Sequence, residues 1–278
     1  MHKPANGLNQ MDPNPQTATD DPALRAVAAK SAEGIPVIIA FSNRLYLRVL
    51  RNWVAAMRRL QIENFVIIAL DEETRAECAA LSVPHGIAHA GSSQFKDLMR
   101  ARVKLFRDLA GRGIDFINSD LDAVWLRDPL PYLESLDGDL LVSQGTIQPP
   151  DILERWGFVA CSGFFLSRAS ERMRRFYDLM IADDRGDQIS MSQVLVSDNV
   201  KFKVTEAYTR TFRGHAITCS RKPIIGKGDQ YKVTVLPHHL FQRLVEDHGE
   251  AFVIHPLSKK EEEDKLRSFR EHGCLFAE

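Results

Sequence analysis

The chain has 278 residues, of which 26% are charged, and its formal net charge of -1 suits a globular domain and disfavours a nucleic-acid partner. Four scattered cysteines without a CxxC pair argue against a zinc knuckle or a disulfide framework. Because no apolar run reaches the roughly 20 residues that span a bilayer and the N-terminus lacks a signal-peptide pattern, we expect a cytoplasmic protein with no membrane span.

The N-terminal stretch differs from the rest of the chain in composition. Residues 1–33 are rich in Pro, Asn, Asp and Thr and poor in aromatic residues, so they bury too little surface to order themselves. We therefore expect a disordered tail over 1–33, with a short helix near Ala23–Lys30, and a single domain over 34–278.

From residue 35 the chain alternates between strand-like and helix-like segments. The expected strands are the apolar runs IPVIIAF, FVIIAL and IDFINSD; one expected helix carries Val49, Trp53, Met57 and Leu60 at helical spacing, a short one runs through Leu81, and a third covers about Gln94 to Leu109. This order predicts an α/β fold with a mainly parallel, twisted sheet flanked by helices. In such sheets ligands bind beyond the carboxyl ends of the strands.

The third of these strands runs into two aspartates, in the sequence SDLDAVWLRDP. Strand alternation would point Asp120 and Asp122 to the same side, where two close carboxylates repel each other unless a cation lies between them. Mn²⁺ and Mg²⁺ take oxygen ligands and share them with substrate phosphates. A pair of aspartates that cap the next turn is the alternative, and D-x-D by itself does not decide between the two.

Five segments, in order, resemble the nucleotide-diphospho-sugar transferases of glycosyltransferase family 77. They are RNWVAAMRRLQIENFVIIALDEET, SDLDAVWLRDPLPYL, GFVACSGFFLSR, GDQISMSQVLV and AFVIHPLSKKEEEDKLRSFREHG. The resemblance covers about residues 35–273. It implies a GT-A-like nucleotide-binding fold, a UDP-sugar donor, Mn²⁺ with Mg²⁺ as the alternative cofactor, and transfer with retention at the anomeric carbon.

The resemblance also implies which residues bind the metal and the donor. The implied metal ligands are Asp120, Asp122 and His255. The implied donor-binding residues are Ala40, Phe41, Ser42, Lys104, Asp120, Ser162, Gly163 and Lys265. Other interpretations stay open: Ser42 fits a helix cap, Lys104 a solvated basic face, Gly163 a close packing contact, and Lys265 a solvated helix, with Lys259 or Lys260 in its place at the diphosphate.

Asp187 and Gln188 are the catalytic candidates, because in related retaining enzymes this acidic-amide segment lies beside the donor sugar. There the two residues would steady positive charge at the anomeric carbon. An N-terminal helix cap is the alternative role of Asp187. Since the family lacks an agreed covalent nucleophile, we expect departure and attack on the same face, with the leaving phosphate oxygen helping to deprotonate the acceptor.

Together these features predict a metal-dependent retaining glycosyltransferase that moves galactose, xylose or arabinopyranose from a UDP-sugar to a hydroxyl of a glycan, a glycolipid or other lipid-linked sugar, or a protein. The alternatives are a non-catalytic nucleotide-sugar or carbohydrate-binding protein with a GT-A shell and, third, a metal-dependent phosphohydrolase. Residues 201–231 fit either a loop over the donor or acceptor, or a solvent-facing loop. His238 and His239 are expected to be structural.

Overall fold

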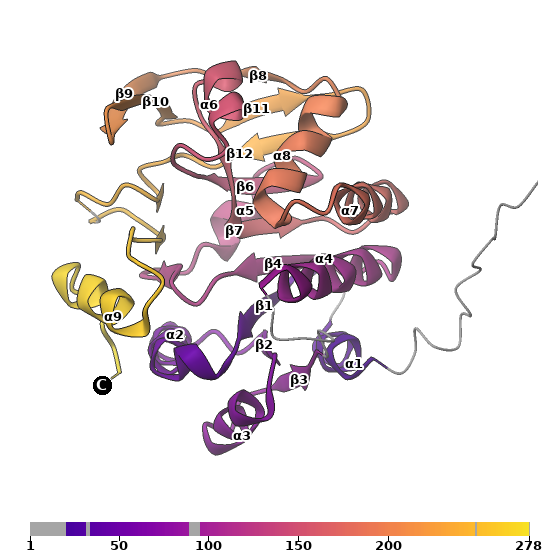
Figure 1. Cartoon of the computed structure of the whole chain (residues 1–278), viewed down its shortest axis with the longest axis vertical. Coiled ribbons are helices and arrows are strands. Elements are labelled where there is room, and N and C mark those ends of the chain that lie inside the picture. Colours follow the sequence, from indigo (N-terminus) through magenta and orange to yellow (C-terminus); the bar gives the residue numbers. More distant parts are fainter. Residues whose placement is uncertain (1–20, 32–33, 89–94, 248, 278) are drawn as a thin grey trace, which may run out of the picture.

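A nine-stranded sheet runs through the centre of the molecule (Figure 1). The computed structural model describes residues 21–31, 34–88, 95–247 and 249–277. Its strands are β1 Val37–Ser42, β2 Phe65–Ala69, β3 His85–Ile87, β4 Phe116–Ser119, β6 Leu140–Gln144, β7 Ala160–Ser167, β8 Lys201–Lys203, β11 Ile224–Lys227 and β12 Lys232–Val235. They follow the order β3-β2-β1-β4-β7-β6-β12-β11-β8, and all but β7 and β11 point the same way. The predicted α/β fold with a mainly parallel sheet is confirmed.

Each face of this sheet has its own hydrophobic core, because successive residues of a strand point to opposite faces. In β1, Val37 and Ile39 pack into one cluster and Ile38 and Ala40 into the other, and all four are fully buried.

The helices are α1 Pro22–Ala28, α2 Leu47–Arg59, α3 Glu72–Ala80, α4 Phe95–Gly111, α5 Leu130–Glu134, α6 Pro150–Trp156, α7 Glu171–Asp183, α8 Asp187–Ser197 and α9 Glu262–Glu271.

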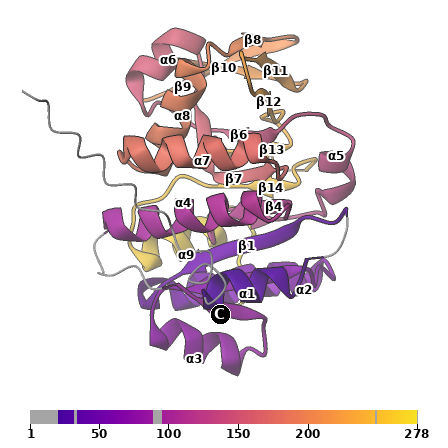
Figure 2. The ribbon, with the colours of Figure 1, turned by 90° about the vertical axis from the view of Figure 1, so that its right-hand side faces the viewer.

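The first face is covered by α1, α4, α7 and α8, and α4 and α7 lie side by side over the sheet (Figure 2). The short helix expected near Ala23–Lys30 is present as α1, with Ala23 fully buried in the core. Gly86 in β3 permits this packing, since a Cβ there would lie 2.7 Å from the Cα of Ala23. This part of the expected tail therefore packs on the domain, whereas residues 1–20, 32 and 33 lie outside the described residues.

The opposite face is covered by α2, α3, α5 and α9 together with a small three-stranded sheet. That sheet has the order β13-β14-β5 and consists of β5 Val124–Trp125, β13 Phe241–Gln242 and β14 Val253–Ile254. Because β14 pairs with β5, the C-terminal part of the chain lies directly against the segment that follows β4.

Residues 201–231 form strands, so the expectation of a plain loop there is wrong. They supply β8 and β11 to the main sheet, and β9 Ala207–Phe212 and β10 His215–Ser220 form a separate antiparallel hairpin. The hairpin shares a small hydrophobic cluster with α6, which includes Ile152 and Ile217. In the part of the chain that the structure describes, no helix has the length and apolarity needed to cross a membrane.

Candidate active site

Two tryptophans hold the carboxyl end of β4 in place. Ser119, the last residue of the strand, is fully buried, and its hydroxyl oxygen accepts hydrogen bonds from the indole N–H groups of Trp53 (3.3 Å) and Trp125 (3.0 Å). A buried hydroxyl with partners from two elements leaves the strand end little freedom. Asp120 follows directly, so its backbone starts from a fixed position.

Asp120 and Asp122 lie in a turn, so the expected strand alternation does not operate here. β4 ends at Ser119; the N–H of Asp120 then donates to the carbonyl of Gly163 (2.7 Å), and the N–H of Ala123 donates to the carbonyl of Asp120 (3.0 Å). Both carboxylates still face one space, as expected, but the turn produces this arrangement.

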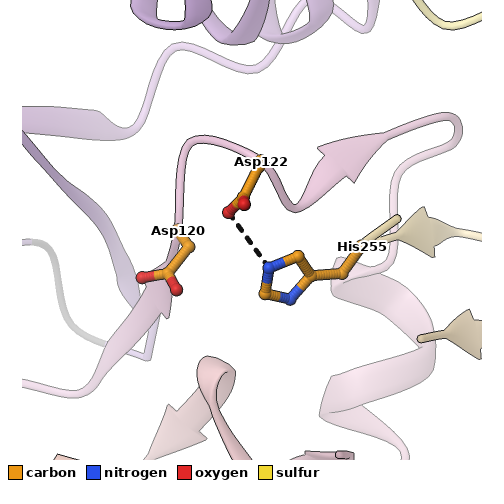
Figure 3. Close-up of side chains that lie close together, drawn as sticks. All are labelled: Asp120, Asp122 and His255. Atoms are coloured by element: carbon orange, nitrogen blue, oxygen red, sulfur yellow. Dashed lines mark ion pairs between the residues drawn. The ribbon is translucent and has the colours of Figure 1, made fainter. Parts of the chain in front are cut away.

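His255 completes a group of three side chains that we name the acidic cluster: Asp120, Asp122 and His255. The pairing of β14 with β5 places His255, which follows β14, opposite the turn, and its Nε2 lies 3.0 Å from Oδ1 of Asp122 (Figure 3). Lys265, from α9, bonds the other carboxylate oxygen of Asp122. The structure thus brings together four residues that the sequence proposed for the metal and the diphosphate.

Gly163 provides the space that the acidic cluster occupies. A Cβ at this position would lie 2.5 Å from Cε1 of His255 and 2.7 Å from Oδ2 of Asp120, so the expected glycine constraint is real. The pairing of β6 with β7 is irregular here: Val142 pairs with Phe165 but the next residue, Ser143, pairs with Cys161. Ser162 and Gly163 lie in the resulting bulge of β7. Such bulges are common beside active sites, where they redirect the backbone.

Burial and neighbouring charges act differently on the members of the cluster. Burial favours a raised pKa at Asp122, but His255 and Lys265 outweigh it and hold the pKa of that carboxyl well below its usual range. At His255, burial and Arg243 lower the pKa, but Asp122 outweighs them and raises it to about 9. At Asp120, burial is the largest influence and raises the pKa, although the charge of Arg102 opposes it.

The acidic cluster fits a divalent cation. Each of its residues offers one ligand atom, and these atoms all lie within 4.8 Å of one another. Two carboxylates suit a hard divalent cation, and a neutral imidazole adds a ligand without adding charge. The space kept open by Gly163 lies against two of the three ligands.

Arg102 is a site residue that the sequence analysis missed. It is 6% exposed, and its Nη2 atom lies 3.1 Å from Oδ1 of Asp120 and 3.5 Å from Oδ2 of Asp187. Burial disfavours its charge, but Asp120 and Asp187 raise its pKa above the usual value. The signal in the sequence was an arginine four residues before Phe106, on the apolar face of the helix.

Lys104 lies on another side of the same helix. It is exposed, and residues two apart on an α-helix point about 200° away from each other, so α4 cannot present both Arg102 and Lys104 to the site. The structure does not bring Lys104 to the acidic cluster, and Arg102 is the basic residue of α4 that reaches it.

The two catalytic candidates lie at the start of α8. Asp187 is joined to Asp120 through Arg102, and its Oδ1 also accepts the N–H of Gln188 (2.7 Å). The N-cap of α8 is Gly186 and no side chain caps this helix, so the alternative role of Asp187 as the helix cap is wrong. The side-chain amide of Gln188 donates to the carbonyl of Gln148 (2.7 Å). Gln188 is therefore held against the segment before α6.

The residues expected at the donor nucleoside lie at the end of β1. Ala40 is fully buried within the sheet, Ser42 is 2% exposed, and the ring of Phe41 lies 5.2 Å from the guanidinium of Arg102. The capping role predicted for this region belongs to Asn43, whose Oδ1 accepts the N–H of Leu45 (3.1 Å). Ser162 is buried beside Gly163 in β7.

Arg243 is a second basic residue that the sequence analysis missed. Its Nη1 donates to the carbonyl of His255 (2.8 Å), and its charge lowers the pKa of both His255 and Asp122. No local pattern marks this arginine, because its neighbour in space, His255, lies 12 residues further along the chain.

The sequence was compared with protein families and with known proteins. The sequence model described as nucleotide-diphospho-sugar transferase matches residues 60–269. The beta-arabinofuranosyltransferase RAY1 of Arabidopsis thaliana is 27% identical over 149 residues, which cover 48% of this chain and 27% of that protein. The arabinosyltransferase XEG113 of the same plant is 26% identical over 180 residues, which cover 57% of this chain and 28% of that protein.

The matches span only part of these proteins. The chain covers a little over a quarter of the length of both arabinosyltransferases. Among solved structures, the apo structure of the bifunctional glycosyltransferase WbbM is 11% identical with a TM-score of 0.47, over 85% of this chain and 50% of that chain.

Proposed function

Because the chain belongs to the nucleotide-diphospho-sugar transferase family, we propose that it is a metal-dependent glycosyltransferase that moves a sugar from a UDP-sugar to a hydroxyl group with retention of configuration. The observation that carries this proposal is the convergence of Asp120, Asp122 and His255 at the carboxyl edge of the sheet. Galactose, xylose and arabinose are the proposed sugars, and the names of the two plant relatives favour arabinose. The acceptor is a glycan, a glycolipid or a protein.

The acidic cluster would hold Mn²⁺, with Mg²⁺ as the alternative, and the bound cation would neutralise the diphosphate that leaves as the glycosidic bond breaks. An imidazole binds a metal in its neutral form, so His255 would give up its proton on binding. Lys265, which bonds Asp122, brings a further positive charge to the same place. It is the lysine that we propose for the diphosphate.

Arg102 and Asp187 act on the other side of the cluster. Arg102 contacts Asp120 and Asp187 together, so it fixes the distance between a metal ligand and the carboxylate beside the donor sugar. Asp187 steadies the positive charge that develops at the anomeric carbon, with Gln188 next to it. A leaving phosphate oxygen takes the proton of the acceptor hydroxyl, and the new bond forms on the face from which the phosphate departs.

Release of UDP from UDP-galactose, UDP-xylose and the two UDP-arabinose forms, measured with Mn²⁺ and with a chelator, tests the donor and the metal. We expect release from one donor, lost in chelator and restored best by Mn²⁺. Undiminished release of UDP in the presence of the chelator would contradict the proposed metal dependence. UDP release that never leads to a glycosylated product, whichever acceptor is added, would favour a hydrolase.

The stereochemistry needs a separate measurement. NMR of the early product should show the anomeric configuration of the donor. An inverted product would mean that a carboxylate such as Asp187 acts as a base for attack from the opposite face, and the roles proposed here would be wrong.

A further inference from the structure

We propose that the cavity between the β9–β10 hairpin and residues 238–247 binds the acceptor, and that the acceptor presents a neutral carbohydrate there. This inference rests on the proposed function and names the class of its second substrate. The cavity has a volume of about 390 Å³, and its lining includes Tyr208, Arg210, Arg221, His239, Gln242 and Glu246. We name it the hairpin cavity. Its volume lies within the roughly 300–1,000 Å³ of small-ligand sites.

The lining of the hairpin cavity mixes strong donors with strong acceptors. Arg210 and Arg221 offer guanidinium N–H groups, while Glu246 and Asp247 offer carboxylate oxygens. Sugar hydroxyls both donate and accept hydrogen bonds, so they satisfy both kinds of side chain. With Glu250 the lining has three carboxylates against two guanidinium groups, which disfavours a phosphate, and a lipid chain requires an apolar lining. The chemistry of the cavity therefore favours an uncharged carbohydrate.

Two groups in the cavity have free hydrogen-bonding capacity. The guanidinium of Arg221 lies 5.6 Å from the centroid of the Tyr208 ring, and no ion pair joins it to a carboxylate among the described residues. Nδ1 of His239 is buried and has no hydrogen-bond partner in the described part of the chain. Arg210, in contrast, is already paired with Glu246. Arg221 is thus the cavity arginine whose donors remain for a ligand.

The hairpin is anchored to the main sheet beside the acidic cluster. Gln144, at the carboxyl end of β6, donates its amide N–H to the carbonyl of Thr218 in β10 (2.6 Å). Tyr208 in β9 is held by His238, whose Nδ1 lies 3.2 Å from the Tyr208 hydroxyl. These contacts fix the cavity in advance of binding, which lowers the entropy cost of recognition.

One residue joins the hairpin cavity to the acidic cluster. Gln242 lines the hairpin cavity and also a smaller cavity that His255 and Arg243 line. The carbonyl of Gln242 accepts the N–H of His255 (2.8 Å). A carbohydrate in the hairpin cavity therefore lies next to Gln242, whose backbone bonds that of the proposed metal ligand His255, so its hydroxyl can point towards the donor.

The test uses the full chain with Mn²⁺ and UDP present, and titrates it with neutral di- and trisaccharides of galactose, glucose, xylose and arabinose. Inorganic phosphate and a short-chain phospholipid are the comparison probes. Arg221→Met keeps the packing on Tyr208 but removes the N–H donors. Lys222→Met is the matched control, because this substitution removes the same charge one residue away. Lys222 pairs with Glu206, and neither residue lines the cavity.

We expect the wild type to bind at least one neutral oligosaccharide, Arg221→Met to bind it about tenfold more weakly, and Lys222→Met to match the wild type. Binding of phosphate or lipid alone, of no oligosaccharide at all, or of oligosaccharide equally by Arg221→Met would overturn the inference. Binding of UDP with Mn²⁺ is measured on the same samples. A wild type that fails to bind UDP contradicts the proposed function instead, so the two failures are distinguishable.

Discussion

The acidic cluster and the hairpin cavity are linked through Gln242 but differ in how far their charged pairs are exposed to water. At the cluster, the side chain of Asp122 and that of its partner Lys265 are both only 15% exposed and depend on each other. At the cavity, the side chain of Glu246, the partner of Arg210, is 68% exposed. Removing one partner of a buried pair leaves an uncompensated charge, whereas water compensates an exposed one. We therefore expect large effects at the cluster and small effects at the cavity.

The largest effect should come from Asp122→Asn. It removes a metal ligand and the carboxylate that His255 and Lys265 share, so transfer should fall by about 10³-fold or more. The measurement is product formation at saturating UDP-sugar and Mn²⁺. Asp137→Asn is the matched control, because Asp137 also pairs with a lysine but its side chain is 82% exposed. Equal losses in the two variants would contradict the comparison.

His255→Ala and Lys265→Ala should separate metal binding by the cluster from donor binding by the lysine beside it. Loss of the imidazole removes a ligand, so the Mn²⁺ concentration for half activity should rise about a hundredfold. Lys265→Ala should instead weaken UDP-sugar binding about tenfold with little change in metal demand, because an ammonium cannot bind a cation. Activation curves over Mn²⁺ at several donor concentrations measure both. If the two variants shift the same parameter, the assignments of His255 and Lys265 are wrong.

Arg102→Met should cost about ten- to a hundredfold in Mn²⁺ affinity, in the range of residues that position metal ligands. The reason is that Arg102 orients the carboxylate of Asp120 and opposes the rise of its pKa, so without the guanidinium a proton competes with Mn²⁺ for this ligand. Calorimetry with Mn²⁺ and the kcat and KM of transfer measure the effect. Arg100→Met is the control, because Arg100 lies on the same helix as Arg102 but forms a more exposed ion pair, with Asp184. This variant should behave like the wild type. Arg102→Lys should restore part of the affinity if the charge matters.

The smallest effect on transfer at neutral pH is expected at the cavity, where substitution of His238 should change the pH dependence of stability instead. Burial lowers the pKa of His238 to about 4, against 6.5 for an ordinary histidine. The unfolded chain therefore binds the extra proton between these pH values, and stability falls as the pH falls from 6.5 to 4, by about 3 kcal/mol. His238→Asn should flatten this slope in denaturant titrations, whereas exposed His215→Asn should not. A slope that His238→Asn leaves unchanged would contradict the assignment.

The first half of the fold was more predictable from local patterns than the second half, where the strand around Gly163 and the helix from Asp187 were expected but the strands of residues 201–231 were not. β1, β2 and β4 are apolar runs in buried strands, and α2 shows its buried face through Val49, Trp53 and Met57. In the second half, β8 and β9 are largely exposed, so they contain no apolar run from which a strand could be predicted. The short β3 also went unrecognised, because Pro84 and Gly86 give the appearance of a break.

The family resemblance, drawn from five ordered motifs, is confirmed by the match over residues 60–269. It pointed to Asp120, Asp122 and His255, which the fold brings together, and to Lys104, which the fold leaves exposed. A motif carries the residues that a family shares. It does not say which face of α4 a given chain turns towards its site.

The sequence by itself determined the local structure: strands where apolar residues run together, helices where they recur every three or four positions, and a glycine at 163 where the backbone needs room. Only the tertiary structure decided that Lys265 meets Asp122 across 143 positions of the chain, that Arg102 joins Asp120 to Asp187, and that a hairpin encloses a cavity next to His255. The reason is physical. Periodicity records which face of an element is buried, whereas contacts between charged residues depend on how elements far apart in sequence pack together.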